Sequence, residues 1–394
     1  MSKKYQSNFT IRLKNAVALD CRVGKQWDWI RRDLFIRNGH WCSNATFYNL
    51  DYDFDGKIII PVFYNLHVHL GESLFEHWKK RTTLKEYLTR TEEFHSYFSP
   101  KDQETLWNLS ANYTLDKLIK NGIGYLGAAR CHSISYTKHL RGMSLYPVMD
   151  SAKLKCFSRS IADFDDFATR ARAMGFQAGI LLHSLYYSTP EDLEFVKACV
   201  KKHNCYLVMH IAEDAVSFAK ENALSGDCIE AVIQNGLLNA KTLLVHGCCL
   251  TSRQLDCVAK TKAMICICPE SNLNIGSLPL NPSILNKKNI PWCIATDGAG
   301  TAKSLSLLSQ ISVLKKLFPA NEISDLMAGV LSAPACFLGH CPGSCFLDDE
   351  PANFQVYSLQ HDLGSSIPDL LQNLLNQDAK LEQVWLQGKI QYWS

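Results

Sequence analysis

The chain has 394 residues and a formal net charge of +3, from 41 Lys and Arg against 38 Asp and Glu. Because the basic residues do not cluster, neither a nucleic acid nor an anionic membrane surface is an expected partner. No apolar run is long enough to span a membrane, and the N-terminus lacks a signal-peptide pattern, so we expect a cytoplasmic protein.

The first 58 residues alternate apolar and polar side chains, as in FTIRLKNAVAL, which is typical of short antiparallel strands. The tail has the same pattern in ANFQVYSL and LEQVWLQGKIQYW. The two ends of a domain often lie close together. We therefore expect residues 1–58 and 345–394 to form one small β-sandwich-like domain.

A long apolar run, KIIIPVFYNLHVH, follows the first segment and ends in His67 and His69. Its β-branched and aromatic residues predict a buried strand. Side chains two residues apart on a strand point to the same side. Both imidazoles could therefore face one metal ion.

Three later strand-like runs also end in a polar side chain that could bind a metal. CYLVMHIA contains His210, with Glu213 three residues later, TLLVHG ends in His246, and PWCIATDG contains Asp297. A buried polar group without a partner is costly, so each of these positions needs a physical reason. A buried side chain whose hydrogen bonds are all made within the core would explain any one of these positions. The four positions together favour a shared metal site.

The spacing of these runs predicts a parallel (βα)8 barrel over residues 59–344. A strand with its crossover helix takes about 30 residues or more, which places the four runs on strands 1, 5, 6 and 8 of eight. The segments NGIGYLGAAR, SLYPVMD, QAGILLHS and AMICICP fit strands 2, 3, 4 and 7. In such a barrel the carboxyl ends of all strands open on one face, where catalytic groups gather.

Helical patterns lie between these strands, and extra helices are expected near 84–97 and 101–120. The stretch PEDLEFVKACVKKH follows Thr189, with Pro190 in the first turn and acids behind it, which is a typical helix start. Because extra structure after strand 1 would lie over the mouth of the site, residues 72–100 are a candidate lid or subunit contact.

The 16 cysteines do not indicate a disulfide-bonded or zinc-finger protein. Several, such as Cys205, Cys266 and Cys293, fall within apolar strands, where free cysteine packs as a small hydrophobe. No two C-x-x-C pairs have zinc-finger spacing. Cys248 and Cys249, beside His246, could contact a metal or substrate, but packing is the favoured interpretation.

From about Arg12 to the C-terminus the chain resembles the amidohydrolase superfamily. Within it, the similarity is to the branch of cytosine deaminase, chlorohydrolase and adenosine-type deaminases. The motifs that carry it are PVFYNLHVHLGE, HIAED, CPESNLNIG with LPLNPSIL, and TDG. Departures are Ala295-Thr296 before the last motif, Ala352-Asn353 near the C-terminus, and a missing cation in GESLFEHW, which argues against nucleoside substrates.

The resemblance implies roles for ten residues. The metal ligands are His67, His69, His210 and Asp297, the proton shuttle is Glu213, and His246 and Asp297 act on the attacking water or the substrate. The implied substrate contacts are His183, Tyr186, Asn272 and Glu72. The structural alternatives are a helix N-terminal acid for Glu213 and a capping residue for Asn272.

The resemblance further implies a homodimer and a small heterocyclic substrate. Because the expected strand 4 contains no Lys to bridge two ions, one divalent metal is favoured, with zinc the default for His ligands and iron also fitting. A metal-activated water and the Glu213 proton carrier together predict hydrolytic deamination of a purine, pyrimidine, triazine or nucleoside-like ring. The alternatives are cyclic amide or amidine C–N chemistry, dechlorination, or a non-catalytic barrel.

Overall fold

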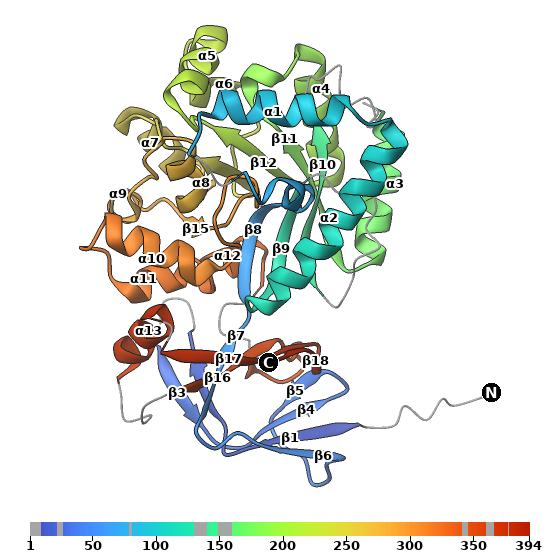
Figure 1. The fold of residues 1–394 in the computed structure, drawn as a ribbon, viewed down its shortest axis with the longest axis vertical. Helices are drawn as coiled ribbons and strands as arrows, with labels where there is room; N and C mark the ends of the chain where they lie inside the picture. Colours follow the sequence, from blue (N-terminus) through green and yellow to red (C-terminus); the bar gives the residue numbers. More distant parts are fainter. Residues whose placement is uncertain are drawn as a thin grey trace, which may run out of the picture.

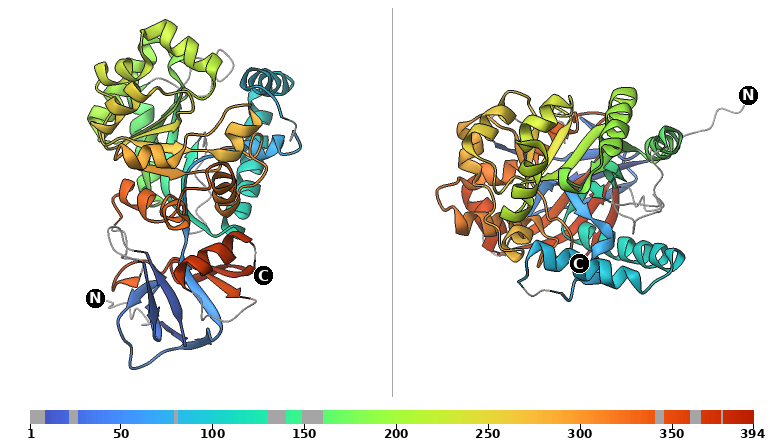
Figure 2. Two further views of the ribbon diagram at one scale, coloured as in Figure 1. Left: turned by 90° about the vertical axis from the view of Figure 1, so that its left-hand side faces the viewer. Right: turned by 90° about the horizontal axis from the view of Figure 1, so that it is seen from above.

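A computed structural model describes residues 9–21, 27–78, 81–129, 140–148, 160–340, 346–359, 366–376 and 378–394. In these residues the chain forms a helix-covered barrel with two smaller β-sheets at one end (Figure 1). The smaller sheets lie away from α5 and α6, and both ends of the chain contribute to them (Figure 2).

Eight parallel strands form the barrel, in the unbroken order of the sequence. They are β8 (Phe63–His69), β9 (Ile123–Ala129), β10 (Arg141–Val148), β11 (Phe176–Leu182), β12 (Tyr206–Ile211), β13 (Thr242–His246), β14 (Met264–Ile267) and β15 (Trp292–Ile294). The expected (βα)8 architecture is confirmed. Strand interiors are almost wholly buried, as in β12 and β13, because helices cover one face and the barrel interior fills the other.

Helices surround this barrel, and the last of them, α13, also packs against one of the smaller sheets. They are α1 (Leu84–Ser96), α2 (Pro100–Lys120), α3 (Ile161–Ala173), α4 (Pro190–His203), α5 (Ala215–Ser225), α6 (Cys228–Gln234), α7 (Ser252–Ala259), α8 (Pro269–Asn274), α9 (Pro282–Lys287), α10 (Leu307–Leu317), α11 (Ile323–Ala328), α12 (Ser332–Phe337) and α13 (Ile367–Asn376). Two 3-10 helices, η1 (Leu70–Phe75) and η2 (Leu185–Tyr187), follow β8 and β11. The predicted start of α4 is confirmed by a capping box between Thr189 and Asp192.

The seam between the first and last barrel strands is closed by buried polar groups. The Asn65 side-chain amide donates to Thr296 Oγ1 at 2.7 Å, and the Thr296 backbone N–H donates to Asn65 Oδ1 at 3.2 Å. One residue further, the Asp297 backbone N–H donates to the His67 carbonyl at 3.1 Å. These bonds hold the carboxyl end of β15, the last barrel strand, beside the carboxyl end of β8, the first.

Two sheets make up the smaller part. The four-stranded sheet contains β5 (His40–Cys42), β4 (Leu34–Arg37), β1 (Thr10–Lys14) and β6 (Leu50–Asp53), in that order. The six-stranded sheet contains β18 (Lys389–Trp393), β17 (Ala379–Leu386), β16 (Phe354–Leu359), β7 (Lys57–Pro61), β2 (Val17–Asp20) and β3 (Asp28–Arg31). The expected meeting of N- and C-terminal strands therefore occurs where β7 pairs with β16.

The single strand expected from KIIIPVFYNLHVH is two strands in the structure. β7 pairs with β2 and β16 in the six-stranded sheet, whereas β8 pairs with β9 in the barrel. The run is apolar throughout because both sheets bury it, so its hydrophobicity carries no signal of the change. As a result, the six-stranded sheet extends to Pro61, a few residues beyond the expected boundary at 58.

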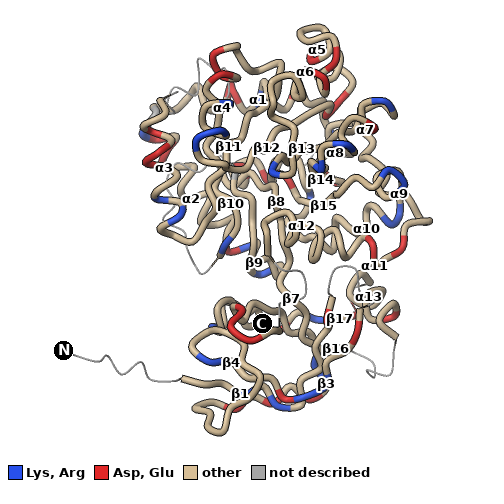
Figure 3. Tube along the Cα trace, turned by 180° about the vertical axis from the view of Figure 1, so that it is seen from behind, with Lys and Arg blue, Asp and Glu red and all other residues tan. Residues whose placement is uncertain are grey.

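Segment 72–100 contains the end of η1 and all of α1, which lies beyond the carboxyl end of β8 (Figure 1). Its role as a lid or subunit contact, and the homodimer, stay predictions. Lys, Arg, Asp and Glu are interspersed over both parts of the molecule (Figure 3). Among the described residues, no helix has the length and apolar character needed to cross a bilayer.

We predict that Asn65→Ala destabilises the protein by about 1–3 kcal/mol, because it removes the acceptor of the buried Thr296 backbone N–H and the donor to Thr296 Oγ1 at the barrel seam. Urea unfolding of the variant and the wild type measures the difference. The matched control is Asn44→Ala at an exposed asparagine, which should stay within about 0.5 kcal/mol of the wild type. Equal stability of the Asn65 variant would contradict the role of the seam bonds.

Candidate active site

The polar side chains predicted from the strand ends gather at the carboxyl end of the barrel. His67 and His69 end β8, His210 lies at the end of β12, His246 ends β13, and Asp297 follows β15. All five are at most 5% exposed. Four imidazoles and a carboxylate therefore share one buried space, which is costly unless they satisfy one another or a bound ion.

Three imidazole nitrogens and one carboxylate oxygen converge on a single point. His67 Nε2 lies 3.1 Å from His210 Nε2. Asp297 Oδ1 lies 3.3 Å from His67 Nε2 and 3.1 Å from His69 Nε2. Two donors of a tetrahedral zinc ion lie about 3.3 Å apart, given the usual bond lengths. The donor set and its spacing therefore fit a divalent metal.

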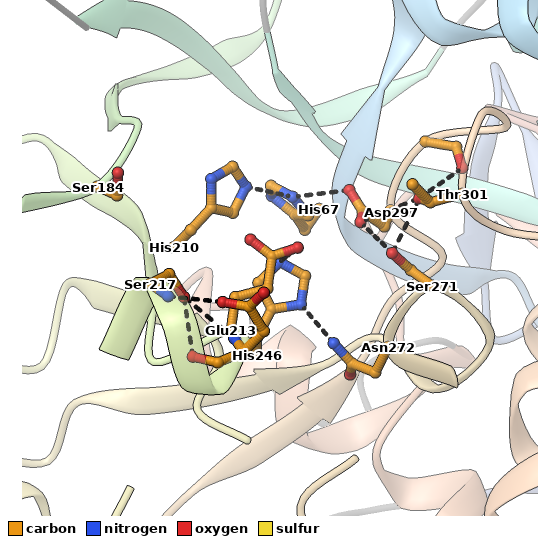
Figure 4. A network of polar contacts seen from close by, with 12 residues as sticks. His67, Ser184, His210, Glu213, Ser217, His246, Ser271, Asn272, Asp297 and Thr301 are labelled. Carbon is orange, nitrogen blue, oxygen red and sulfur yellow. Dashed lines mark hydrogen bonds and ion pairs between the residues drawn. The ribbon is translucent and has the colours of Figure 1, made fainter. Parts of the chain in front are cut away.

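The second oxygen of Asp297 is held by hydroxyl groups. Ser271 donates to Asp297 Oδ2 at 2.6 Å, and Thr301 approaches the same oxygen at 3.4 Å (Figure 4). This arrangement leaves Oδ1 turned toward the imidazoles. Burial alone would raise the pKa of Asp297, but hydrogen bonds from His67 and His69 hold it well below its ordinary value.

His246 is oriented by an amide on the far side of its ring. The Asn272 side-chain nitrogen, which can only donate, lies 2.9 Å from His246 Nδ1 (Figure 4). Nδ1 is therefore the acceptor, and the proton of the neutral ring is on Nε2, which points toward Glu213 Oε1 at 3.5 Å. Burial lowers the pKa of His246 to about 3, so the ring is a neutral donor at physiological pH.

Glu213 lies in the loop between β12 and α5, with its side chain directed at the same space (Figure 4). Without a bound cation, burial and then the charge of Asp297 raise its pKa well above the ordinary value. The α5 N-terminus does not use this carboxylate, because Asp214 is its N-cap. The proton-transfer role and the helix N-terminal interpretation of Glu213 both stay predictions.

Three of the site segments adopt left-handed backbone conformations without glycine. The φ angles are 47° at Ala212, 75° at His246 and 62° at Asp297. Each lies at or just beyond a strand end, where the chain turns sharply toward the next element. Such strain of about 1–3 kcal/mol per residue persists where the surrounding structure fixes it, and it clusters at functional sites.

Glu221 fixes the turn that carries Glu213. Its carboxylate, on α5, accepts the Ala212 backbone N–H at 2.9 Å and is 1% exposed. Burial raises the pKa of Glu221 to about 7. A buried acid thus supports the strained residue between His210 and Glu213.

The remaining predicted residues line the site at different depths. The His183 ring centroid lies 4.8 Å from that of His210 in an edge-to-face contact, and the Lys220 ammonium lies 5.3 Å from the Tyr186 ring centroid. Burial, followed by the charge of Glu213, raises the pKa of Tyr186. Glu72 lies 3.6 Å from His69 Nδ1. The predicted substrate contacts of His183, Tyr186, Asn272 and Glu72 stay predictions.

Comparison with known proteins places this site within a family. The model of the amidohydrolase family matches residues 58–325, which is more than half of the chain. The chain belongs to the amidohydrolase family. The family assignment made from the motifs is therefore confirmed.

Among curated relatives of this amidohydrolase, the 5-methylthioadenosine/S-adenosylhomocysteine deaminase of Pyrococcus horikoshii is 22% identical over 289 residues. The match covers 69% of this chain and 66% of that protein, so it spans slightly less than two thirds of the relative. The fold is similar to that of an adenosine deaminase from Xanthomonas campestris with bound zinc, at TM-score 0.85, 16% identity and coverage of 98% and 93%. A mutant atrazine chlorohydrolase from Arthrobacter aurescens gives TM-score 0.79, 14% identity and coverage of 96% and 94%.

Two polar residues described above, Thr301 and Glu221, were not predicted from the sequence. Ser271 falls within the motif CPESN, but nothing in the motif shows that its hydroxyl faces Asp297. Glu221 lies on α5, where the apolar residues Val216 and Leu224 are exposed, so the periodicity of the helix does not show that Glu221 faces inward. The sequence contains no signal for the partners of these residues, because those contacts depend on how the helices pack.

We predict that the free energy of unfolding of the wild type falls between pH 5 and pH 8, and that Glu221→Gln lacks this fall. The difference between the two proteins should be about 2 kcal/mol over this range. The folded-state pKa of Glu221, about 7, lies above the ordinary value of 4.5, so the folded state binds the extra proton and its stabilisation disappears as pH rises through this window. Gln retains an acceptor for Ala212 but does not titrate. Urea unfolding at both pH values measures the difference.

Glu194→Gln is the matched control, because Glu194 is an exposed acid on the neighbouring helix α4. Its pH dependence should equal that of the wild type. Identical pH dependence of the Glu221 variant and the wild type would show that the buried acid does not titrate in this range.

Proposed function

We propose that this amidohydrolase is a metal-dependent aminohydrolase that removes an exocyclic amine from a heterocycle and releases ammonia. The observation that carries the proposal is the convergence of His67, His69, His210 and Asp297 beside a buried carboxyl, Glu213. The deaminase name of the Pyrococcus relative supports the reaction class. The fold similarity to an adenosine deaminase agrees with it.

The proposed ligands are His67 Nε2, His69 Nε2, His210 Nε2 and Asp297 Oδ1, and they would hold one ion. Zinc is the proposed metal because three imidazoles and a carboxylate suit it, and iron would fit the same donors. When bound, such an ion acts as a Lewis acid and lowers the pKa of water to about 7, so hydroxide is available at neutral pH. The candidate strand for a bridging Lys, β11, has the sequence FQAGILL and contains none.

The protein side chains supply the proton transfers. A ring carbon that carries an amine is a poor electrophile until the neighbouring ring nitrogen gains a proton. Glu213 takes a proton from the attacking water and delivers it to that nitrogen as the new C–O bond forms. It then takes the remaining proton from the added hydroxyl group and passes it to the amine, the C–N bond breaks, ammonia leaves and the ring carbon becomes a carbonyl. A positioned acid and base of this kind typically contributes about 10²–10⁴ in rate.

His246 and Asp297 complete the arrangement. The Nε2–H of His246 points into the site because Asn272 occupies Nδ1, so it can donate to the oxygen that develops negative charge. Asp297, kept ionised by its imidazole neighbours, can accept a hydrogen bond from the attacking water. His246 and Asp297 therefore both act in the protonation state that their surroundings favour.

The alternative reactions differ in the leaving group. Hydrolysis or formation of a cyclic amide or amidine C–N bond, and displacement of chloride, require the same activated water. The fold similarity to an atrazine chlorohydrolase makes chloride the second leaving group to test. A non-catalytic barrel is disfavoured because all the donors and the shuttle carboxyl are present.

Ammonia release from the metal-loaded protein tests the proposal. Aminopurines, their nucleosides, aminopyrimidines and amino- and chlorotriazines form the panel, with chloride measured in parallel. We expect ammonia from at least one ring amine, and a loss of about 10²-fold or more in Glu213→Gln with unchanged metal content. Glu230→Gln, at an exposed acid, is the control and should retain full activity. Chloride release without ammonia, or a fully active Glu213 variant, would contradict the proposal.

We predict that His69→Ala loses the metal, because one of the four donors and its packing against His67 are removed. Mass-spectrometric metal analysis after dialysis should give close to one equivalent for the wild type and little for the variant. His203→Ala removes an imidazole that pairs with Asp165 far from the site and should keep the wild-type metal content. Equal metal in both variants would show that His69 is not a ligand.

A further inference from the structure

A carboxylate and a phenol extend the site behind His69. Glu72, in η1, places Oε1 at 3.6 Å from His69 Nδ1, on the other side of the ring from Asp297. The Tyr87 hydroxyl donates to Glu72 Oε2 at 2.7 Å. Tyr87 lies in the first turn of α1 and is 5% exposed. Tyr87 and His69 are buried and the Glu72 side chain is 12% exposed, so a largely buried row of contacts runs from α1 to the proposed ligand.

Two glycines in the loop after Asp297 leave space for the side chains of Glu72 and Tyr87. A Cβ at Gly298 would overlap the Glu72 carboxylate, and a Cβ at Gly300 would overlap the Tyr87 hydroxyl. The loop that follows the carboxylate ligand thus packs directly against the groups behind the imidazole ligand. Glu72 and Tyr87 are therefore held from two sides, by α1 and by the loop after β15.

The chemistry of a metal-binding imidazole indicates what Glu72 and Tyr87 do beside His69. A neutral ring that offers Nε2 to a metal carries its proton on Nδ1. A carboxylate beside that N–H orients the ring, fixes its tautomer and makes Nε2 a stronger donor. A separation of 3.6 Å is slightly longer than a hydrogen bond, and a small shift of the ring on metal binding would close it. The Tyr87 hydroxyl fixes the carboxylate that performs this role.

We propose that Glu72 and Tyr87 are positioning residues for His69, through which helix α1 contributes to metal affinity. The inference rests on the proposed function in one respect, namely that His69 binds the metal. It assigns Glu72 a role behind the ligand in place of the substrate contact expected from the sequence. It also links helix α1, within segment 72–100, to the ion.

Zinc affinity, measured by competition with a chromophoric chelator, tests the proposal without any substrate. Glu72→Gln keeps the size of the side chain and an acceptor for Tyr87 but removes the charge, and we expect zinc affinity to fall about 10–100-fold. Tyr87→Phe should weaken zinc binding in the same direction by a smaller factor. Because Tyr87 acts through Glu72, the double variant should bind zinc no more weakly than Glu72→Gln alone.

Two further variants separate positioning from a general loss of structure. Tyr97→Phe removes a hydroxyl at the C-terminal end of the same helix, where Tyr97 is 75% exposed, and should bind zinc as the wild type does. Gly300→Ala displaces the Tyr87 hydroxyl without changing either polar side chain, and should reproduce the effect of Tyr87→Phe. Absorption spectra of the cobalt-loaded proteins should show a changed ligand field in the Glu72 and Tyr87 variants only.

The outcomes distinguish this inference from the proposed function. A wild type that binds no zinc would overturn both. A wild type that binds zinc tightly, with unchanged affinity and cobalt spectra in Glu72→Gln and Tyr87→Phe, would overturn only the positioning role. Lower melting temperatures at unchanged zinc affinity would show that the pair stabilises the fold alone, which also contradicts the inference. Strictly additive losses in the double variant would contradict the route through Glu72.

Discussion

Imidazole nitrogens that face one another at 3.1 Å in a buried space need a cation or a shared proton between them. Burial and then the neighbouring imidazoles keep the pKa of His210 well below its ordinary value, so the His210 ring is not the cation that balances Asp297. Asp297 adds a carboxylate that stays ionised beside the same nitrogens. A divalent cation satisfies all of these groups at once, and the rest of the site is arranged around that requirement.

The barrel meets this requirement through the ends of its strands. Parallel strands bring residues far apart in sequence to one face, and the Asn65–Thr296 bonds hold the first and last strands in register. Left-handed turns at His246 and Asp297 then direct each side chain inward at the point where its strand stops. The stability of the fold maintains local strain at the residues that carry out the proposed reaction.

Much of this arrangement could be predicted from the sequence, because apolar strands that end in His or Asp give both the secondary structure and the direction of the polar side chain. The change from β7 to β8 could not be predicted, since both strands are buried on both faces. The orientation of His246 was equally hidden, because Asn272 lies on a different element and only the folded barrel brings its amide to Nδ1. The periodicity of a helix or strand can be recognised in a single sequence. The contacts between different helices and strands cannot.

The reaction proposed for this protein requires that four side chains bind one ion at the carboxyl end of the barrel. Anomalous diffraction from crystals of the zinc-loaded protein, recorded on both sides of the zinc absorption edge, tests it most directly. We expect one strong anomalous peak at about 2.0–2.2 Å from His67 Nε2, His69 Nε2, His210 Nε2 and an oxygen of Asp297. A zinc peak elsewhere in the molecule, with none among these four side chains, would contradict it.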